Sequence, residues 1–430
     1  MPRRNLNIIM LAAFLSLICY HRAARTRYAA VFADAVNQIQ DSYVEPVDQR
    51  TLFNAAMDGM MSELDPYSSY IDPETLAQFN ADIDQEFGGI GVEVSLDPDT
   101  ERLTIVNPLP DTPAFDAGAM AGDQIMAVDG ESTEGWPLAD AVGVIRGPPG
   151  TEVIITVARD GEDAPLDLNI TRAKIEIESV LGDTRNSDGS WNFHLEEDPG
   201  IGYIRIASFG KNTAVELREI LIRLQRENVR GLIFDVRRNP GGLLDVAVEI
   251  CDMFIDEGVL VSTRGRGGVE EDPPYTASKH GTVVRKHLPI AVLVDQWSAS
   301  ASEIFAACLQ DYERAVVVGE RTWGKGTVQN ITNLEGGRSA LKLTVATYWR
   351  PSEKNIHRLS EDREDENGDW GVRPNNGLEV KLDEEQSKTL YETQRDRAIV
   401  PKGDQPHELD GARPDPVLLK ALEVVKKMGR

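Results

Sequence analysis

The sequence contains few cysteines and few histidines. Its three cysteines are too few for a disulfide framework, and Cys251 and Cys308 lie in apolar stretches typical of small buried side chains. The six histidines do not cluster, and His280 and His287 have no metal-ligand spacing to an acidic residue. We therefore expect neither a disulfide scaffold nor a metal centre, and no cofactor.

Positive charge is also scarce in this chain. Lysine and arginine number 45 against 71 acidic residues, which gives a net charge of −26. A protein that works by holding phosphates or anionic lipid needs the opposite balance. The composition therefore excludes nucleic acid as the expected partner, while 41% hydrophobic residues are typical of a soluble globular protein of two to three domains.

One apolar run stands out, at residues 6–20, directly after Arg3 and Arg4. The run is short for a membrane span, and the order of basic then apolar residues is typical of an export signal. No clear cleavage site follows it, so a cleaved signal and an uncleaved membrane anchor both remain open. We assign residues 1–27 to this segment and expect a periplasmic or otherwise extracytoplasmic protein of the cell envelope.

The remaining chain divides into four segments by its residue patterns. Apolar residues recur at helical spacing over 28–85, which predicts an N-terminal helical segment. Residues 86–175 carry short strands around one helix, 138–145, and predict a small, partly open β-barrel. Over 176–380, near-continuous apolar strands alternate with helices, which predicts an α/β core with a sheet buried on both faces. Residues 381–430 form a weakly helical tail without a motif.

Several local details of the core can be predicted as well. Thr213 and Glu216 have the spacing of a capping box at the start of a helix over 213–227. The segments 262–287 and 352–370 are polar and rich in glycine, proline or charge, so we expect them to be loops.

Three stretches of the core have the residue types that catalysis needs. In RRNPGG, 237–242, a strand ends in a glycine turn before a helix, where backbone N–H groups can stabilise a developing negative charge. In WSASASEIFAACLQD, 297–311, Ser300 begins a helix after a buried strand, where α/β sheets place their sites. An ordinary strand-to-helix turn and a helix cap formed by Ser300 and Glu303 are the alternatives.

The third stretch is TWGKGTVQ, 322–329, in which glycines flank Lys325. If the chain is extended after Lys325, then Lys325, Thr327 and Gln329 share one face. A lysine is a base only when neutral, so its pKa would have to fall by several units from about 10.4 through burial, to which Trp323 could contribute. The alternative is a surface lysine in a hairpin. Because no histidine lies near these stretches, we expect no Ser-His-Asp triad.

In this order, DVRRNPGG, SASASEI and, 25 positions later, GKGTVQ, the chain resembles the carboxyl-terminal processing, or tail-specific, serine proteases. LDPYSSYIDP and GYIRIASF match further stretches, and the resemblance covers roughly residues 30–380. The order of elements in 86–175, with GGIGV and AGDQIMAVDG, resembles a PDZ domain. The family implies a Ser/Lys catalytic pair in a crotonase-like α/β core, with a PDZ domain that engages the C-terminal tail of the substrate.

The resemblance also implies roles for individual residues. Ser300 would be the nucleophile, Lys325 the general base and Gln329 the residue that orients the lysine amine. The backbone N–H of Ala301 and that of Gly241, or its neighbour Gly242, would form the oxyanion hole. One departure is visible, because Trp297 stands where family members often have glycine. Trp297 does not alter the dyad, but the shape of the substrate cleft cannot be taken over from the family at this position.

The PDZ-like segment offers a site for the substrate tail. Gly89, Ile90 and Gly91 lie in the loop that would donate N–H groups to a free C-terminal carboxylate. Arg146 is a candidate to sense the bound tail, with a plain surface arginine as the alternative. The pocket for the terminal side chain would be lined by apolar residues of the following helix, namely Leu138, Val142 and Ile145.

We therefore expect a serine endopeptidase that acts on proteins or peptides with free, apolar C-termini. The alternatives are a catalytically inactive PDZ scaffold and a crotonase-like acyl-CoA enzyme. The first would not need Ser300, Lys325 and Gln329 together, and the second would need neither an export signal nor a PDZ insert. The oligomeric state cannot be predicted from the sequence.

Overall fold

The computed structural model describes residues 27–97, 100–270, 273–358, 368–401 and 415–429. All but the last residue of the predicted signal or anchor, 1–27, therefore lies outside the described residues. Within the described ranges, no helix combines the length and the apolar character needed to cross a membrane. The chain forms two compact units. We call Met1–Leu76 with Gln329–Thr344 the N-terminal unit, and Ala77–Val328 with Val345–Arg430 the main unit.

A six-stranded sheet lies at the centre of the main unit, and its fully buried strands explain the apolar runs in the sequence. Four strands run parallel, in the spatial order β14 (Asp198–Ile206), β15 (Gly231–Asp235), β18 (Ile290–Val294) and β19 (Val316–Gly319). Two short strands, β10 (Val180–Leu181) and β13 (His194–Leu195), pair antiparallel with β14. The parallel order with helical crossovers confirms the predicted α/β class.

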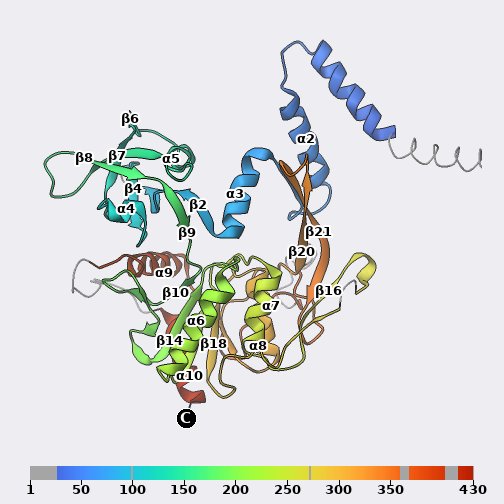
Figure 1. Ribbon diagram of the computed structural model, residues 1–430. Coiled ribbons are helices and arrows are strands. Elements are labelled where there is room, and N and C mark those ends of the chain that lie inside the picture. The colour runs from blue at the N-terminus through green and yellow to red at the C-terminus, as the bar shows by residue number, and fades with distance from the viewer. Residues whose placement is uncertain (1–26, 98–99, 271–272, 359–367, 402–414, 430) are drawn as a thin grey trace, which may run out of the picture. The chain divides into compact units, whose positions relative to one another are not determined.

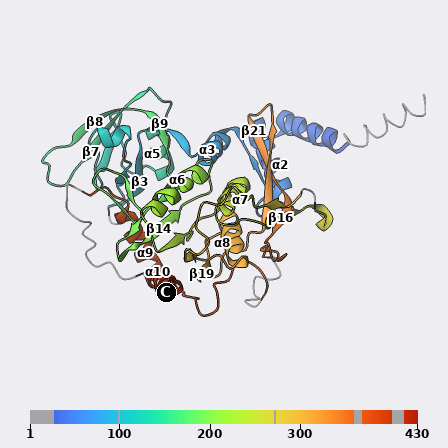
Figure 2. The same ribbon diagram turned by 60° about the horizontal axis from the view of Figure 1, so that its bottom comes forward.

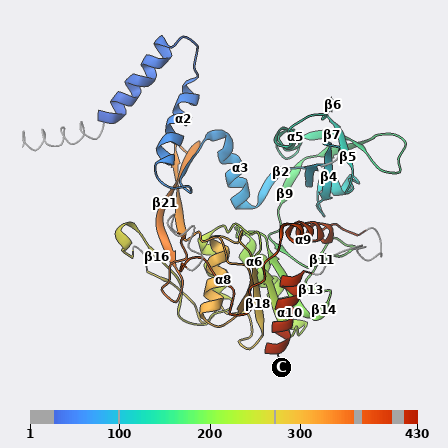
Figure 3. The same ribbon diagram turned by 180° about the vertical axis from the view of Figure 1, so that it is seen from behind.

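Helices cover both faces of this sheet. On one face lie α6 (Thr213–Arg226), α7 (Leu244–Asp252) and α8 (Ala301–Asp311), while α10 (Pro416–Met428) lies on the other (Figure 1, Figure 3). Figure 2 shows α7 and α8 side by side. Alternate side chains of a strand point to opposite faces, so Phe234 packs with α8 and Ile233 with α10. The predicted tail thus contributes a helix to the core, preceded by α9 (Glu384–Arg397).

The predicted capping box of α6 is wrong. Asn212 is the N-cap, and Thr213 is already helical and buried. The Glu216 carboxylate accepts hydrogen bonds from the backbone N–H groups of Ser179 and Val180, both at 3.1 Å. Glu216 therefore connects the start of β10 to α6 and does not cap α6.

The segment predicted as the loop 262–287 contains regular structure. It completes β16 (Val259–Arg264), which pairs with β17 (Tyr275–Thr276) and with β21 (Ser339–Trp349). The chain is extended after Lys325, as β20 (Thr327–Leu334), which forms a long hairpin with β21.

The PDZ segment has a hydrophobic core of its own. Residues such as Ile105, Ile125 and Val157 are almost fully buried in it. The main sheet is antiparallel and consists of β3 (Val92–Leu96), β4 (Leu103–Pro108), β5 (Gln124–Val128), β7 (Glu152–Ala158) and β8 (Leu166–Thr171), with β6 (Glu131–Ser132) beside β5. The remaining elements are α4 (Pro113–Asp116), α5 (Leu138–Ile145), and β2 (Glu86–Gly89) paired with β9 (Ala173–Glu176).

The N-terminal unit is mostly helical, as predicted for 28–85, but it also contains a strand. Residues 27–42 are helical, followed by α2 (Gln49–Ser62) and, at the boundary with the main unit, α3 (Pro73–Asp84). Between these two helices, β1 (Ser69–Ile71) pairs antiparallel with residues 340–342 of β21.

Candidate active site

Ser300 lies at the turn between β18 and α8, where it is half-buried and serves as the N-cap of the helix. Its φ is +56°, a value that costs free energy for a residue with a side chain. A serine held on a sharp, strained strand-to-helix turn is the arrangement that presents a hydroxyl nucleophile in α/β hydrolases. The predicted position of Ser300 beyond a buried strand is therefore confirmed.

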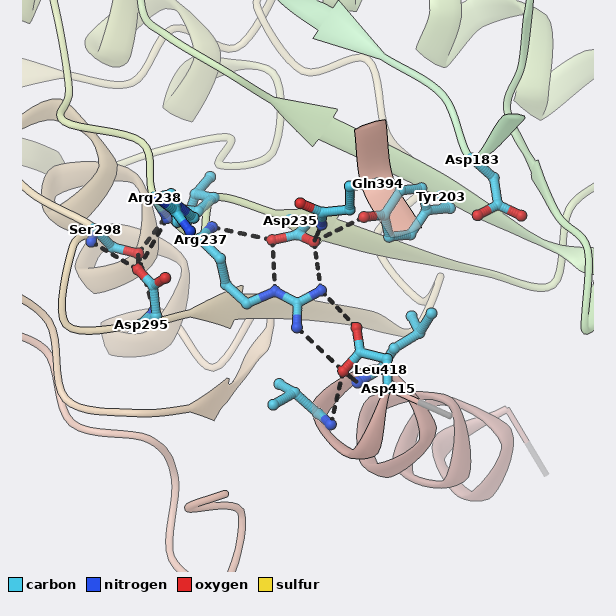
Figure 4. Close-up of polar contacts among 12 residues, drawn as sticks. Asp183, Tyr203, Asp235, Arg237, Arg238, Asp295, Ser298, Gln394, Asp415 and Leu418 are labelled. Atoms are coloured by element: carbon cyan, nitrogen blue, oxygen red, sulfur yellow. Dashed lines mark hydrogen bonds and ion pairs between the residues drawn. The ribbon is translucent and has the colours of Figure 1, made fainter. Parts of the chain in front are cut away.

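The turn before Ser300 is held by a buried carboxylate. Asp295 accepts hydrogen bonds from the backbone N–H groups of Trp297 and Ser298, both at 3.0 Å, and of Arg238 at 2.9 Å. Figure 4 shows Asp295 between Arg238 and Ser298. Burial raises the pKa of Asp295, and these N–H donors oppose the rise. The Ser298 hydroxyl also donates to the Val236 carbonyl, so the turn is fastened to the end of β15.

The glycine turn 239–242 lies against Ser300. A Cβ on Gly241 would lie 2.7 Å from the Ser300 Cβ and 2.9 Å from the Ala301 nitrogen, so only glycine fits there. The fully buried Asn239 organises this contact, since its carbonyl accepts from the Ala299 N–H at 3.0 Å. The two stretches that the sequence analysis selected independently are thus in direct contact.

The amides of this turn are not equivalent as oxyanion donors. The Gly241 N–H donates to the side-chain oxygen of Asn239 at 2.8 Å, so in this conformation it is already occupied. The backbone of Phe209 pairs with this turn: its N–H donates to the Gly241 carbonyl, and its carbonyl accepts from the Leu243 N–H. Neither of these two hydrogen bonds uses the N–H of Gly242. Ala301 is the first residue of α8, and the first amides of a helix have no intrahelical acceptor. Of the two glycines, Gly242 is therefore the better candidate to act with Ala301.

Glu303 is the functional residue that the sequence analysis missed, because it was read only as a capping partner. Its side chain is fully buried on α8 and accepts four hydrogen bonds. One carboxylate oxygen accepts from the Ser300 N–H at 2.9 Å and the Lys325 N–H at 2.8 Å, and the other from the Thr322 hydroxyl at 2.6 Å and the Gly324 N–H at 2.8 Å. Burial raises the pKa of Glu303 to about 7, although these donors oppose the rise. One carboxylate thus joins the serine turn to the lysine loop.

The lysine loop is held on its other side as well. The Tyr348 hydroxyl donates to the Lys325 carbonyl, and the Tyr348 N–H donates to the Gly326 carbonyl at 3.0 Å. The Trp370 ring lies against Gly324, and the guanidinium groups of Arg321 and Arg358 lie 3.4 and 4.2 Å from its centre. The main chain of Lys325 is therefore fixed, and its side chain is half-buried.

Gln329 lies on β20 in the part of the hairpin that belongs to the N-terminal unit. Its side-chain amide donates to the Thr344 hydroxyl at 3.1 Å, and that hydroxyl donates to Asp65 at 3.1 Å. Asp65 also accepts from the Tyr67 N–H at 2.8 Å. Burial alone would raise the pKa of Asp65, but its hydrogen bonds outweigh burial and lower the pKa. The motif LDPYSSYIDP thus supports the strand opposite Gln329, a role that sequence reasoning did not assign.

The predicted tail-binding loop of the PDZ segment is rigidly held. The Ile90 side chain is buried in the PDZ core, and its carbonyl accepts from the Ala114 N–H at 2.8 Å. Gly91 has a φ of +82°, and a Cβ there would lie 2.3 Å from the Thr112 Cβ. Gly89 ends β2. A fixed loop of this kind can present N–H groups without a further ordering cost.

The helix beside this loop differs from the prediction. Ile145 is buried in the PDZ core, so the expectation that it lines the tail pocket is wrong, whereas Leu138 is partly exposed and Val142 intermediate. Arg146 is partly exposed. Its guanidinium lies 4.4 Å from the centre of the Phe87 ring and donates a hydrogen bond to Gln78.

Two cysteines lie in the core of the main unit. Cys251 and Cys308 are buried, and the hydrogen bond between them together with burial raises the pKa of Cys251 well above its ordinary value. Their prediction as small buried residues is confirmed. Across the described ranges, no group of three or more His, Cys, Asp or Glu side chains is arranged to hold a metal ion.

Comparison with known proteins places this geometry in a family. Residues 200–364 match peptidase family S41, residues 104–159 match a PDZ domain, and residues 21–75 match the N-terminal domain of the activating protease CtpB. A carboxy-terminal-processing protease of Bartonella bacilliformis is 38% identical over 334 residues, which cover 77% of this chain and 73% of the relative. The carboxy-terminal processing protease CtpB of Bacillus subtilis is 36% identical over 326 residues, 75% of this chain and 64% of that protein.

A solved structure with a related description is the photosystem II D1 C-terminal processing protease. It shares 28% sequence identity with this chain at a TM-score of 0.44, and the match covers 82% of this chain and 92% of that chain.

Proposed function

The chain belongs to the carboxy-terminal processing proteases of peptidase family S41, and on that basis we propose that it is a serine endopeptidase that cuts proteins near their C-termini with a Ser/Lys dyad. The observation that carries this proposal is the Glu303 carboxylate, which accepts from the backbone N–H groups of both Ser300 and Lys325. A single buried group thereby holds the proposed nucleophile and the proposed base on adjoining segments.

The reaction uses the two side chains in turn. The neutral Lys325 amine accepts the proton of the Ser300 hydroxyl as the oxygen attacks the substrate carbonyl. The N–H groups of Ala301 and Gly242 stabilise the negative charge that develops on the carbonyl oxygen. As the peptide bond breaks, the lysine returns the proton to the leaving amine, and water then releases the acyl group by the same route. Gln329 orients the lysine amine in this scheme, as the family resemblance implies.

The PDZ segment selects the substrate. A free C-terminal carboxylate is an anion that several convergent N–H donors can hold, and an extended tail can add as a strand to a sheet edge. The loop with Gly89, Ile90 and Gly91 is held in place by its carbonyls and by the tight approach of Thr112 to Gly91. In this proposal Arg146 senses the occupied loop, which its contacts with Phe87 and with Gln78 of α3 support. The preferred tail is apolar.

The place of action follows from the N-terminal sequence. Basic residues followed by an apolar run direct the chain for export, with the bulk of the protein outside the cytoplasm and a single anchor where the run is not removed. Fractionation of tagged protein tests this, and quantitative recovery from the cytoplasm would contradict it.

The function is tested with an unfolded model protein that carries a free, apolar C-terminus. We expect the full chain to cleave it, and Ser300→Ala to remain folded without cleaving it. A second substrate with the same sequence and an amidated C-terminus should be cleaved more slowly, because amidation removes the charge. Equal cleavage of the two substrates would refute tail recognition alone, whereas cleavage that persists in Ser300→Ala would refute the proposed nucleophile.

A further inference from the structure

Two tryptophans form an exposed pair at the surface of the main unit. Trp297 is 52% exposed and Trp323 is 43% exposed. Their rings stack with centres 5.8 Å apart and planes inclined by 26°. Large aromatic side chains supply much of the free energy of recognition when a partner covers them. The exposed part of this stacked pair is therefore an apolar area that a ligand can cover.

The pair is fixed by the backbones that carry it. The Trp297 N–H donates to Asp295 at 3.0 Å, within the turn that precedes the nucleophile. The Trp323 N–H donates to the Ser298 carbonyl at 3.0 Å, so the two tryptophan segments are joined directly. Because neither ring has to be ordered on binding, little conformational entropy is lost when a ligand covers the pair.

The position of the pair relates it to the chemistry. Trp297 precedes Ser300 by three residues, and Trp323 precedes Lys325 by two. Both tryptophans therefore lie on the two segments that Glu303 joins, and both are exposed. The exposed pair is thus carried by the same two segments as the proposed nucleophile and the proposed base.

We propose that the Trp297–Trp323 pair is a substrate subsite that binds a large apolar or aromatic side chain within two residues of the cleaved bond. This inference rests on the proposed protease function and adds a preference that is separate from tail recognition by the PDZ segment. The occupant is apolar because the ring faces are apolar. The guanidinium-bearing side chain of Arg358, which lies against Gly324 next to Trp323, disfavours a basic side chain that could otherwise bind the ring faces.

The first experiment maps cleavage sites by mass spectrometry in a set of unfolded proteins with free C-termini. For the wild-type chain, we expect Phe, Tyr, Trp, Leu or Met to be enriched at one fixed position within two residues of the cleaved bonds. The enrichment should fall in Trp297→Ala and in Trp323→Ala, and Trp297→Phe should restore most of it because a ring remains. Tyr43→Ala, which removes an exposed aromatic side chain elsewhere, is the matched control.

The second experiment measures kcat/KM for two peptides that differ only by Phe or Ala at the enriched position. We expect the wild type to prefer Phe by about tenfold or more, and the preference to approach one in both alanine variants. Labelling of Ser300 by a small fluorophosphonate reports whether the dyad is assembled in each variant. An unchanged preference in labelled Trp297→Ala and Trp323→Ala would overturn the subsite, as would a wild type without an enriched position.

The two proposals fail in different ways. A wild-type chain without any Ser300-dependent cleavage would overturn the protease function and, with it, the subsite. A wild-type chain that cleaves through Ser300, and whose site preference is the same with or without the two indoles, would overturn the subsite alone.

Discussion

Glu303→Gln is the substitution that tests the core of the proposed site. The two oxygens of the wild-type carboxylate accept hydrogen bonds from four donors. A glutamine side chain has only one oxygen, and its NH2 group cannot accept. If the glutamine oxygen stays with the N–H groups of Ser300 and Lys325, its NH2 faces Thr322 and Gly324. In the variant, the Thr322 hydroxyl can rotate and accept a hydrogen bond from the glutamine NH2. The backbone N–H of Gly324 cannot do so and is left buried without an acceptor. Such a donor costs about 1–3 kcal/mol at any pH.

The larger effect depends on pH. Burial raises the pKa of Glu303 from its ordinary value of 4.5 to about 7 in the folded chain. Between these values the folded protein keeps a proton that the unfolded chain has lost, so this group stabilises the fold fully below pH 4.5. That contribution is lost as the pH rises through about 7. A difference of about 2.5 pKa units corresponds to about 3 kcal/mol.

The assay is urea unfolding of the wild type and of Glu303→Gln between pH 5 and pH 8.5. We expect the free energy of unfolding of the wild type, relative to the variant, to decline by about 3 kcal/mol across this range. Glu249→Gln, which alters a half-exposed carboxylate on α7, is the control and should show no such trend. If the difference in the free energy of unfolding between the wild type and Glu303→Gln stayed constant with pH, Glu303 would not be a neutral, buried carboxyl below pH 7.

Three further predictions concern other parts of the chain. Ser300→Ala and Lys325→Ala should each abolish cleavage, and the double variant should be no worse than either, as measured by initial rates; additive losses would show that the two do not act as a unit. Gly91→Ala forces a side chain onto a φ of +82°, so calorimetry should show a PDZ transition less stable by about 2 kcal/mol or more, with fluorophosphonate labelling of Ser300 retained. Arg237→Met leaves the fully buried Asp235 without its cation and should lower the stability of the main unit by about 3–5 kcal/mol; a loss below about 1 kcal/mol would contradict the structural role of the pair.

The sequence was sufficient wherever the signal is local. The bounds of α5 agree with the predicted range 138–145, because periodicity and flanking turns determine them without help from distant residues. The pairing of β1 with β21 was not predicted. Strand pairing over hundreds of residues depends on register between remote segments, which the pattern of one strand does not contain.

The candidate site shows the same division. The types and order of Ser300 and Lys325 can be read from motifs, but the role of Glu303 depends on which donors reach its buried oxygens. In the sequence, its only signal is an acidic residue at the start of the otherwise apolar helix SEIFAACL. The choice between Gly241 and Gly242 likewise depends on the side chain of Asn239, which occupies one of the two amides.

The C-terminal residues show most clearly why a weak pattern can conceal a structural role. Arg237 pairs with Asp235 at 2.6 Å and with Asp415, the N-cap of α10, at 2.8 Å (Figure 4). Burial alone would lower the pKa of Arg237, but the two carboxylates outweigh burial and raise the pKa well above its ordinary value. Arg237 lies two residues before Asn239, whose carbonyl accepts from the Ala299 N–H next to Ser300. The ion pair between Arg237 and the N-cap of α10 therefore also helps to position the turn beside Ser300. A segment without a motif of its own therefore helps to fix the site, through one ion pair and the apolar face of a single helix.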